Sequence, residues 1–234
     1  MGYGVSHSHF FLDSLLPIGY HIGMKIKQIL DELLLTPHWD GKECVLELKE
    51  NKYWWKMLEW FGFWFEYSAL ALLLPSIGGK APGPRVGNTK FDYQCRKKVW
   101  DFKASPTNSS SPFIKLNSKR NMRECIKTYG HYGIIIAQGI AHYEKDGEFR
   151  KWHDDLKGGP TEYTLASRKA GRTNRRRKTS FDLAEISILE FKSLDELDEA
   201  IESGLIKETY VTQPKLDGKT YGYDKYTLDK RKCA

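Results

Sequence analysis

The chain has 234 residues, of which 40% are hydrophobic, 13% are aromatic and 29% are charged. This length suits one medium-sized domain with a sound core, and the composition excludes an intrinsically disordered chain. The formal net charge of +7 favours a polyanionic partner such as a nucleic acid.

Four cysteines are widely spaced and include no Cys-x-x-Cys pair, which indicates neither a disulfide framework nor a zinc site. The N-terminus lacks the pattern of a secretory signal. The most apolar run, Trp60–Leu74, contains Glu66 and is too short for a membrane span. The sequence therefore predicts a cytoplasmic protein with no membrane contact.

Two helices are predicted in the first third of the chain. Apolar residues recur at helical spacing in Met24–Leu35, and Pro37 should end that helix. In Tyr53–Leu74 the apolar and aromatic side chains cover more than one helical face, which predicts a buried helix ended by Pro75. Glu66 lies inside this apolar wall and needs a partner there. It is either part of a functional site or a structural carboxylate paired with an Arg or Lys.

The stretch Asn88–Ala104 predicts two short strands joined by a basic turn, with Asp92 closing the first strand. Side chains alternate between the faces of a strand, so Asp101 and Lys103 should share one face while Phe102 takes the other. Two carboxylates and an ammonium group would then meet at one point on a small sheet.

This grouping suits metal-assisted hydrolysis. Paired carboxylates can hold a divalent cation through oxygen ligands. The cation can activate a water molecule and stabilise charge on a phosphoryl oxygen. A neighbouring lysine could position or deprotonate that water. The alternative interpretation is a surface hairpin with ordinary charges.

A rival for the same chemistry lies further towards the N-terminus. Glu47-Leu48-Lys49 is a second acidic-x-Lys match, and Asp40 precedes it at a plausible distance. It has no obvious preceding helix that would supply a further acid to the site, and no apolar strand follows closely. This group therefore ranks below the pair Asp101 and Lys103.

A loop rich in Ser, Asn and Pro is expected at Ser105–Ser118, from where it could reach DNA. After a short basic helix at Arg120–Tyr129, the run Tyr132–Ala141 predicts a strand that is buried on both faces. Gln138 interrupts this strand. It either makes local hydrogen bonds in the core or faces the functional site.

The remaining elements alternate along the chain. They are a helix at Glu148–Lys157, a strand at Phe181–Phe191, an acidic helix capped by Ser193 and ending at Ser203, a strand at Ile206–Thr212, and a tail or small hairpin at Lys215–Ala234. In the first of these helices, adjacent His153, Asp154 and Asp155 point in different directions, which favours a solvated face over a metal site.

The most basic run of the chain is Ser167–Lys178, which contains no acidic residue. Side chains at this density neutralise phosphates and release counterions, and arginine can also read guanine in the major groove. The expected DNA contacts are Arg168, Lys169, Arg172, Asn174, Arg175, Arg176, Arg177 and Lys178.

The spacing of Asp92, eight intervening residues and Asp101-Phe102-Lys103 resembles the signature of the PD-(D/E)xK nucleases, which include many type II restriction endonucleases. Phe91 stands where the signature usually has proline, and the last acid is Asp rather than Glu. A wider pattern is similar to uncharacterised restriction-endonuclease-like sequences between Tyr53 and Lys178. It comprises Trp60-Phe61-Gly62-Phe63, Phe65-Glu66, Gly83-Pro84, Gly87-Asn88 and Trp100–Ala104.

The resemblance implies an α/β fold with a mixed central β-sheet flanked by helices. Residues 1–52 would form an N-terminal extension, 53–192 the nuclease core and 193–234 a C-terminal helix and tail. It also implies a Mg²⁺ ion held by Asp92, Asp101 and the Phe102 carbonyl, with Glu66 binding the metal or a metal-bound water. Lys103 would orient or activate the attacking water.

The activity implied is that of a type II restriction enzyme of a bacterium or archaeon, which cuts double-stranded DNA at a specific sequence and leaves 5′-phosphate and 3′-hydroxyl ends. A palindromic target would require a two-fold homodimer. Two alternatives stay open: a nucleic-acid-binding protein without catalysis, and a repair or structure-specific nuclease of the same fold.

Overall fold

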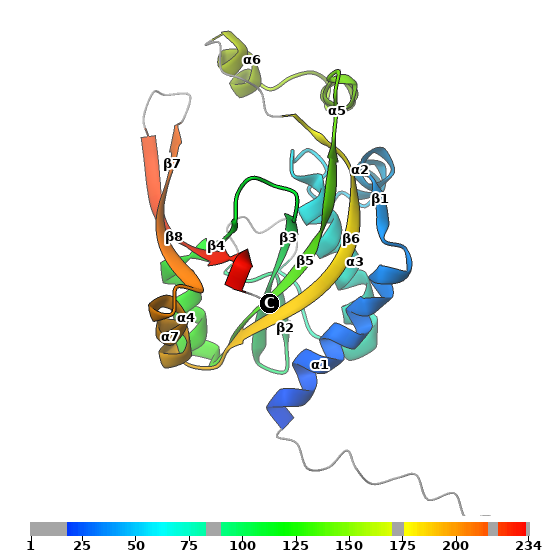
Figure 1. The fold of residues 1–234 in the computed structure, drawn as a ribbon. Coiled ribbons are helices and arrows are strands. Elements are labelled where there is room, and N and C mark those ends of the chain that lie inside the picture. The colour runs from blue at the N-terminus through cyan, green and yellow to red at the C-terminus, as the bar shows by residue number, and fades with distance from the viewer. Residues whose placement is uncertain (1–17, 83–89, 170–175, 215–219, 233–234) are drawn as a thin grey trace, which may run out of the picture.

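The computed structural model describes residues 18–82, 90–169, 176–214 and 220–232 of the chain. Its architecture is mixed α/β, with a curled five-stranded sheet and a second sheet of three strands (Figure 1). The five-stranded sheet has the order β1-β6-β5-β3-β2, and the three-stranded sheet has the order β4-β8-β7. The expectation of a mixed sheet flanked by helices is confirmed.

The described helices are α1 (Ile18–Leu30), α2 (Gly41–Glu50), α3 (Trp60–Ile77), α4 (Lys119–Tyr129), α5 (Glu148–Leu156), α6 (Glu162–Lys169) and α7 (Leu194–Glu202), with short 3₁₀ turns at Asp31–Leu35 and Lys230–Lys232. The strands are β1 (His38–Asp40), β2 (Tyr93–Cys95), β3 (Lys98–Pro106), β4 (Phe113–Ser118), β5 (Tyr132–Tyr143), β6 (Lys178–Phe191), β7 (Ile206–Pro214) and β8 (Thr220–Asp229).

Strand β5 lies at the centre of the larger sheet, parallel to β3 and antiparallel to β6. Its apolar side chains from Tyr132 to Ala137 are buried, which confirms the prediction of a strand covered on both faces. Gly133 is required there, because a Cβ atom at this position would lie 2.1 Å from the ring of Trp100.

Two hydrophobic cores cover the two faces of β3 and β5. The first core contains Trp100, Phe102 and Ile135 and lies under α1, α2 and α3. The second core contains Val99 and Ile134, and packs the opposite face of β3 and β5 against α4, α7 and the three-stranded sheet. Since Val99 and Asp101 are two residues apart on β3, Asp101 faces the side of the second core.

Helix α3 differs from the predicted helix at both ends. It begins at Trp60 rather than Tyr53, because Lys52 and Trp54 adopt positive φ angles of 56° and 35° that break the helix. It also continues through Pro75 to Ile77, where the Gly78 N–H closes the final turn on the Leu74 carbonyl at 3.1 Å.

The C-terminal elements follow the sequence pattern closely. Ser193 caps α7 by accepting a hydrogen bond from the Glu196 N–H at 3.1 Å. Strand β8 pairs antiparallel with both β7 and β4, so the segment expected to be a tail or a small hairpin contributes a full strand to the second sheet. No helix within the described ranges is long and apolar enough to cross a membrane.

Candidate active site

The predicted hairpin is present as β2 and β3, joined by a two-residue turn. Arg96 and Lys97 in this turn have φ angles of 47° and 66°, the conformation that two-residue hairpin turns require. Pairing runs from Cys95 opposite Lys98 to Tyr93 opposite Trp100. Beyond Trp100, the edge of β3 is therefore not covered by β2.

Asp92 lies at this open edge. It precedes β2 and does not close a strand, which corrects the prediction. Its backbone N–H donates to the Trp100 carbonyl at 2.9 Å. Its side-chain Oδ2 accepts a hydrogen bond from the Phe102 N–H at 2.8 Å. The carboxylate thus takes the place of the missing strand partner and is fixed beside β3.

Asp101 and Lys103 share a face of β3, as the alternation of the strand predicts. The Lys103 ammonium group contacts the Asp101 carboxylate and also donates to the Phe102 carbonyl at 3.1 Å. Asp101 is only 3% exposed. Together with the hydrogen bond from Phe102 to Asp92, these contacts bring all four predicted groups of the hairpin to one place.

Glu66 approaches this cluster from α3. Phe65, its neighbour, packs edge-to-face against Phe102 with ring centroids 5.7 Å apart, which fixes α3 against β3. The Tyr53 hydroxyl donates to Glu66 Oε1 at 2.6 Å. Burial raises the pKa of Glu66, Tyr53 and Lys103 oppose the rise, and Asp101 adds to it. Glu66 is therefore close enough to Asp101 and Lys103 to interact electrostatically with both.

The cluster contains three acidic side chains and one basic side chain. Burial raises the pKa of Asp92 well above its ordinary value, and repulsion from Asp101 adds to the rise. Burial alone would lower the pKa of Lys103, but Asp101, Asp92 and Glu66 together raise it. Lys103 is thus a firmly protonated ammonium group at neutral pH, and one positive charge faces three acids.

The donor atoms of this site fit a hard divalent cation. Carboxylate and carbonyl oxygens are the ligands that Mg²⁺ prefers, and Mg²⁺ usually binds through only one or two protein carboxylates. Asp101 and the Phe102 carbonyl already surround a cation, the Lys103 ammonium group. Among the described residues, no three His, Cys, Asp or Glu side chains are grouped so that they could hold a metal ion by themselves.

We expect Mg²⁺ to stabilise the protein, and to do so more at pH 8 than at pH 5. The raised pKa values mean that the folded chain holds protons on Asp92 and Glu66 more tightly than the unfolded chain does. This contribution to stability is present below about pH 4, near the unfolded pKa values, and is lost as the pH rises through the folded ones. A bound cation replaces the lost protons, and at one hundred times its Kd it adds about 2.7 kcal/mol.

Thermal unfolding with and without Mg²⁺ checks this expectation. The substitution Asp92→Asn should raise the unfolding temperature in EDTA at pH 8 and remove most of the Mg²⁺ effect. Asp155→Asn, a change of the same kind at an exposed residue of α5, is the matched control. An equal Mg²⁺ effect in both variants would show that the cation binds elsewhere.

The rival site is not assembled. Glu47 and Lys49 lie on helix α2, where residues two apart point in different directions. The Asp40 side chain caps this helix by accepting from the N–H groups of Lys42 at 2.8 Å and Glu43 at 3.0 Å. The Lys49 ammonium group lies over the Trp55 ring, 5.3 Å from its centroid. These residues have structural roles on a helix.

Gln138 lies on the face of β5 that carries the candidate site. It pairs with Ser105 of β3, and Ile136 pairs with Lys103. Since paired residues of parallel strands project to the same face, Gln138 follows Lys103 along that face. Its side chain is half-buried.

Only part of the basic run can be located. Arg172, Asn174 and Arg175 lie outside the described residues, as does the side chain of Arg168. Helix α6, which ends at Lys169, lies beyond α5 at the far end of β5 and β6 from β2 (Figure 1). Lys169 and Arg176 are exposed.

The last two residues of the run have partners inside the protein. The backbone N–H of Arg177 donates to Glu144 Oε1 at 2.9 Å. The Lys178 ammonium group donates to Glu59 Oε2 at 2.5 Å and lies 4.6 Å from the centroid of the Phe61 ring. Their expected DNA contacts stay predictions, and the charge of Lys178 is already balanced by Glu59.

His153, another group considered as a metal ligand, has a structural role. Its ring is 2% exposed and its Nε2 atom is 2.9 Å from the Trp55 carbonyl oxygen. Burial lowers its pKa, which favours the neutral ring. The neighbouring Asp154 forms an ion pair with Lys157 at 2.9 Å. The predicted solvated face is wrong for His153 and Asp154, which are both buried, whereas Asp155 is exposed.

Sequence reasoning missed two polar residues near the cluster. Tyr53 binds Glu66, but nothing in the sequence shows that a turn brings them together. Lys225 of β8 is half-buried, and burial together with repulsion from Lys103 lowers its pKa. It comes from the three-stranded sheet, more than one hundred residues along the chain, so no local pattern could have linked it to Asp101.

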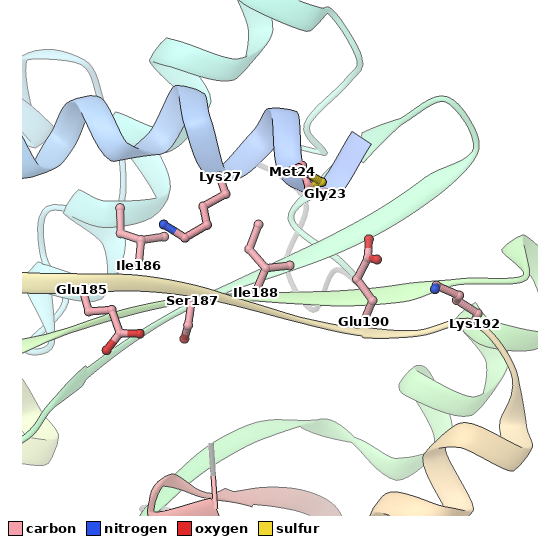
Figure 2. A pocket seen from close by; sticks show the side chains of 9 residues that line it. All are labelled: Gly23, Met24, Lys27, Glu185, Ile186, Ser187, Ile188, Glu190 and Lys192. Atoms are coloured by element: carbon pink, nitrogen blue, oxygen red, sulfur yellow. The ribbon is translucent and has the colours of Figure 1, made fainter. Parts of the chain in front are cut away.

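A cavity of about 380 Å³ lies between α1 and β6 (Figure 2), and none of its lining residues belongs to β2 or β3. Figure 2 shows Ile186, Ile188 and Glu190 of β6 pointing towards α1. The Glu190 carboxylate lies 3.2 Å from His131 Nε2 and 3.6 Å from the Lys98 ammonium group. Its charge is thus balanced within the protein, which makes this cavity a weaker candidate for chemistry.

Comparison with known proteins gives no family assignment: the chain matches no protein-family model, no curated protein and no solved structure. The functional argument therefore rests on the residues and their geometry.

Proposed function

We propose that the chain is a Mg²⁺-dependent endonuclease with a restriction-endonuclease-like core, which cuts double-stranded DNA at a specific sequence. The observation that carries the proposal is the cluster at the open edge of β3. There Asp92 accepts from the Phe102 N–H, and Lys103 contacts both Asp101 and the Phe102 carbonyl.

In this proposal Asp92, Asp101 and the Phe102 carbonyl hold Mg²⁺, and Glu66 binds either the metal or a water on it. Bound there, the cation would act as a Lewis acid towards a phosphodiester and lower the pKa of a water molecule. Hydrolysis would leave 5′-phosphate and 3′-hydroxyl ends.

In this proposal Lys103 acts as a hydrogen-bond donor and not as a base. Although burial lowers its pKa, Asp101, Asp92 and Glu66 raise it further, so without a metal ion the ammonium group is protonated at neutral pH and can hold a water or a phosphate oxygen by hydrogen bonds. Of the two roles that the sequence allowed, orienting the water is therefore the better supported one.

Substrate binding in this proposal relies on charge. The net charge of +7 attracts DNA, and the exposed Lys169 and Arg176 offer phosphate contacts at the end of the sheet that carries α6. A palindromic target would be cut by a homodimer, with one cluster on each strand.

Incubation of supercoiled plasmid with the protein tests this function. In Mg²⁺ we expect discrete linear fragments, and in EDTA we expect binding without cleavage. Sequencing the fragment ends would give the target and the stagger. Binding in both buffers with cleavage in neither would support a non-catalytic binder, whereas cuts only at branched or damaged DNA would support a repair nuclease.

A further inference from the structure

A polar pocket lies at the end of β3, past the cluster of Asp92, Asp101 and Lys103. It has a volume of about 340 Å³. Its lining combines the loop between β3 and β4 with Gln138 of β5 and the turn that follows β8. The residues are Thr107, Ser109, Ser110, Ser111, Pro112, Gln138, Lys230 and Arg231. Hydroxyl, amide and cationic groups therefore surround one space.

The loop wall of this pocket is held in place by β5. The Thr107 N–H donates to the Gly139 carbonyl at 2.7 Å. The Asn108 amide donates to the Ala141 carbonyl at 2.9 Å and accepts from the Ala141 N–H at 3.1 Å, in the manner of a strand partner. The pocket is thus formed before any ligand arrives.

Lys230 closes the pocket from the other sheet. Its ammonium group donates to the Pro106 carbonyl at 2.9 Å and to Ser109 Oγ at 3.1 Å. Both acceptors are neutral, and in the described part of the chain no carboxylate pairs with Lys230. Burial lowers its pKa. A half-buried cation without a counter-ion costs free energy, which an anion beside it would offset.

Of the other two polar groups, Arg231 and Gln138, it is Gln138 that could bind an anion. Arg231 is already neutralised by Asp229, with bonds of 2.9 and 2.7 Å to the two carboxylate oxygens. The Gln138 amide makes no hydrogen bond to a described residue, and so has two N–H donors free for a ligand. An anion in this pocket would therefore bind the positive charge of Lys230 and the amide donors of Gln138.

The pocket is aligned with the catalytic cluster. Gln138 pairs with Ser105, two residues beyond Lys103 on the same face of β3. Two residues along a strand span roughly 6.6 Å. A DNA strand whose scissile phosphate lies at Asp101 and Lys103 would thus carry a neighbouring phosphate towards Lys230.

We propose that Lys230 and Gln138 form a binding site for a backbone phosphate of the DNA strand, next to the phosphate that is cut. This inference rests on the proposed function for its substrate. It sets the path of the DNA strand along β3, from Asp101 and Lys103 towards the loop between β3 and β4.

The salt dependence of DNA binding tests the site in the full-length protein. Binding of a short fluorescent duplex is measured in EDTA, so that no cleavage occurs, over a series of salt concentrations. Losing one phosphate contact lowers the slope of log K against log salt by about 0.9. We expect Lys230→Gln to lower the slope by this amount. Lys230→Arg, which keeps the positive charge, should have the slope of the unchanged protein.

Lys232→Gln is the matched control. It removes the same charge two residues away, where the ammonium group donates to the Ser203 carbonyl, and should leave the slope unchanged. Gln138→Glu leaves the bonds of Lys230 to Pro106 and Ser109 in place but adds a negative charge to the pocket. It should weaken DNA binding even if Lys230→Gln folds poorly.

Equal slopes for Lys230→Gln and the unchanged protein would overturn the site. A second result would also overturn it. If inorganic phosphate raised the unfolding temperature, and Lys230→Gln abolished that effect but left the salt slope of DNA binding unchanged, the pocket would bind a free anion and not DNA. The two proposals fail separately. If Lys230→Gln lowered the slope but the protein did not cleave DNA in Mg²⁺, the phosphate site would be supported and the nuclease function rejected. Cleavage with an unchanged slope would support the nuclease function and reject the phosphate site.

Discussion

Replacing Asp101 with Asn should lower the rate of Mg²⁺-dependent DNA cleavage by about 10³-fold or more, because a metal ion supplies several kcal/mol of transition-state stabilisation and each 1.36 kcal/mol is a factor of ten. The change keeps the shape of a side chain that is only 3% exposed. It removes the charge that contacts Lys103. DNA binding in EDTA should persist.

Initial rates of plasmid cleavage measure the loss, with circular dichroism as the check on folding. Glu47→Gln is the matched control, because Glu47 belongs to the acidic-x-Lys sequence that lies on a helix. It should keep full activity. If folded Asp101→Asn still cut DNA at the normal rate, Asp101 would have no part in catalysis.

Substituting Lys103 with Met should lower the cleavage rate by about 10²–10³-fold, the loss typical of removing one fixed donor from a developing negative charge. Methionine keeps a long side chain for the half-buried position but cannot hold a water or a phosphate oxygen. The loss should appear in kcat with little change in KM, because the role proposed for Lys103 is to stabilise the transition state.

Single-turnover cleavage separates these two quantities. Lys49→Met is the control, since Lys49 belongs to the rival acidic-x-Lys sequence and its ammonium group lies over the Trp55 ring. A loss confined to KM would show that Lys103 only attracts DNA. Retention of most activity by Lys103→Arg would support the role of a protonated donor, because arginine stays protonated at any working pH.

The parts of the fold that the sequence predicted are those set by local periodicity. The alternation of Asp101, Phe102 and Lys103 put the acid and the lysine on one face and the aromatic ring on the other, as observed. The nearly continuous apolar run of β5 likewise predicted a strand buried on both faces, and β5 lies at the centre of the larger sheet. These features follow from the two-residue repeat of a strand and from burial on two faces.

Other features depend on contacts between distant segments, which no local pattern encodes. Asp92 reaches Phe102 only because β2 is short and leaves the edge of β3 open. Glu47-Leu48-Lys49 fits the same motif as the site but lies on a helix, because Asp40 caps it at Gly41. Lys230 joins the pocket through the three-stranded sheet.

The most direct test of the account is the location of a bound metal by anomalous diffraction from crystals grown with Mn²⁺, a stand-in for Mg²⁺. We predict a single strong peak between the carboxylates of Asp92 and Asp101, beside the Phe102 carbonyl, that is absent from crystals of Asp101→Asn. A peak at another site, or none between these carboxylates, would contradict the metal-dependent mechanism.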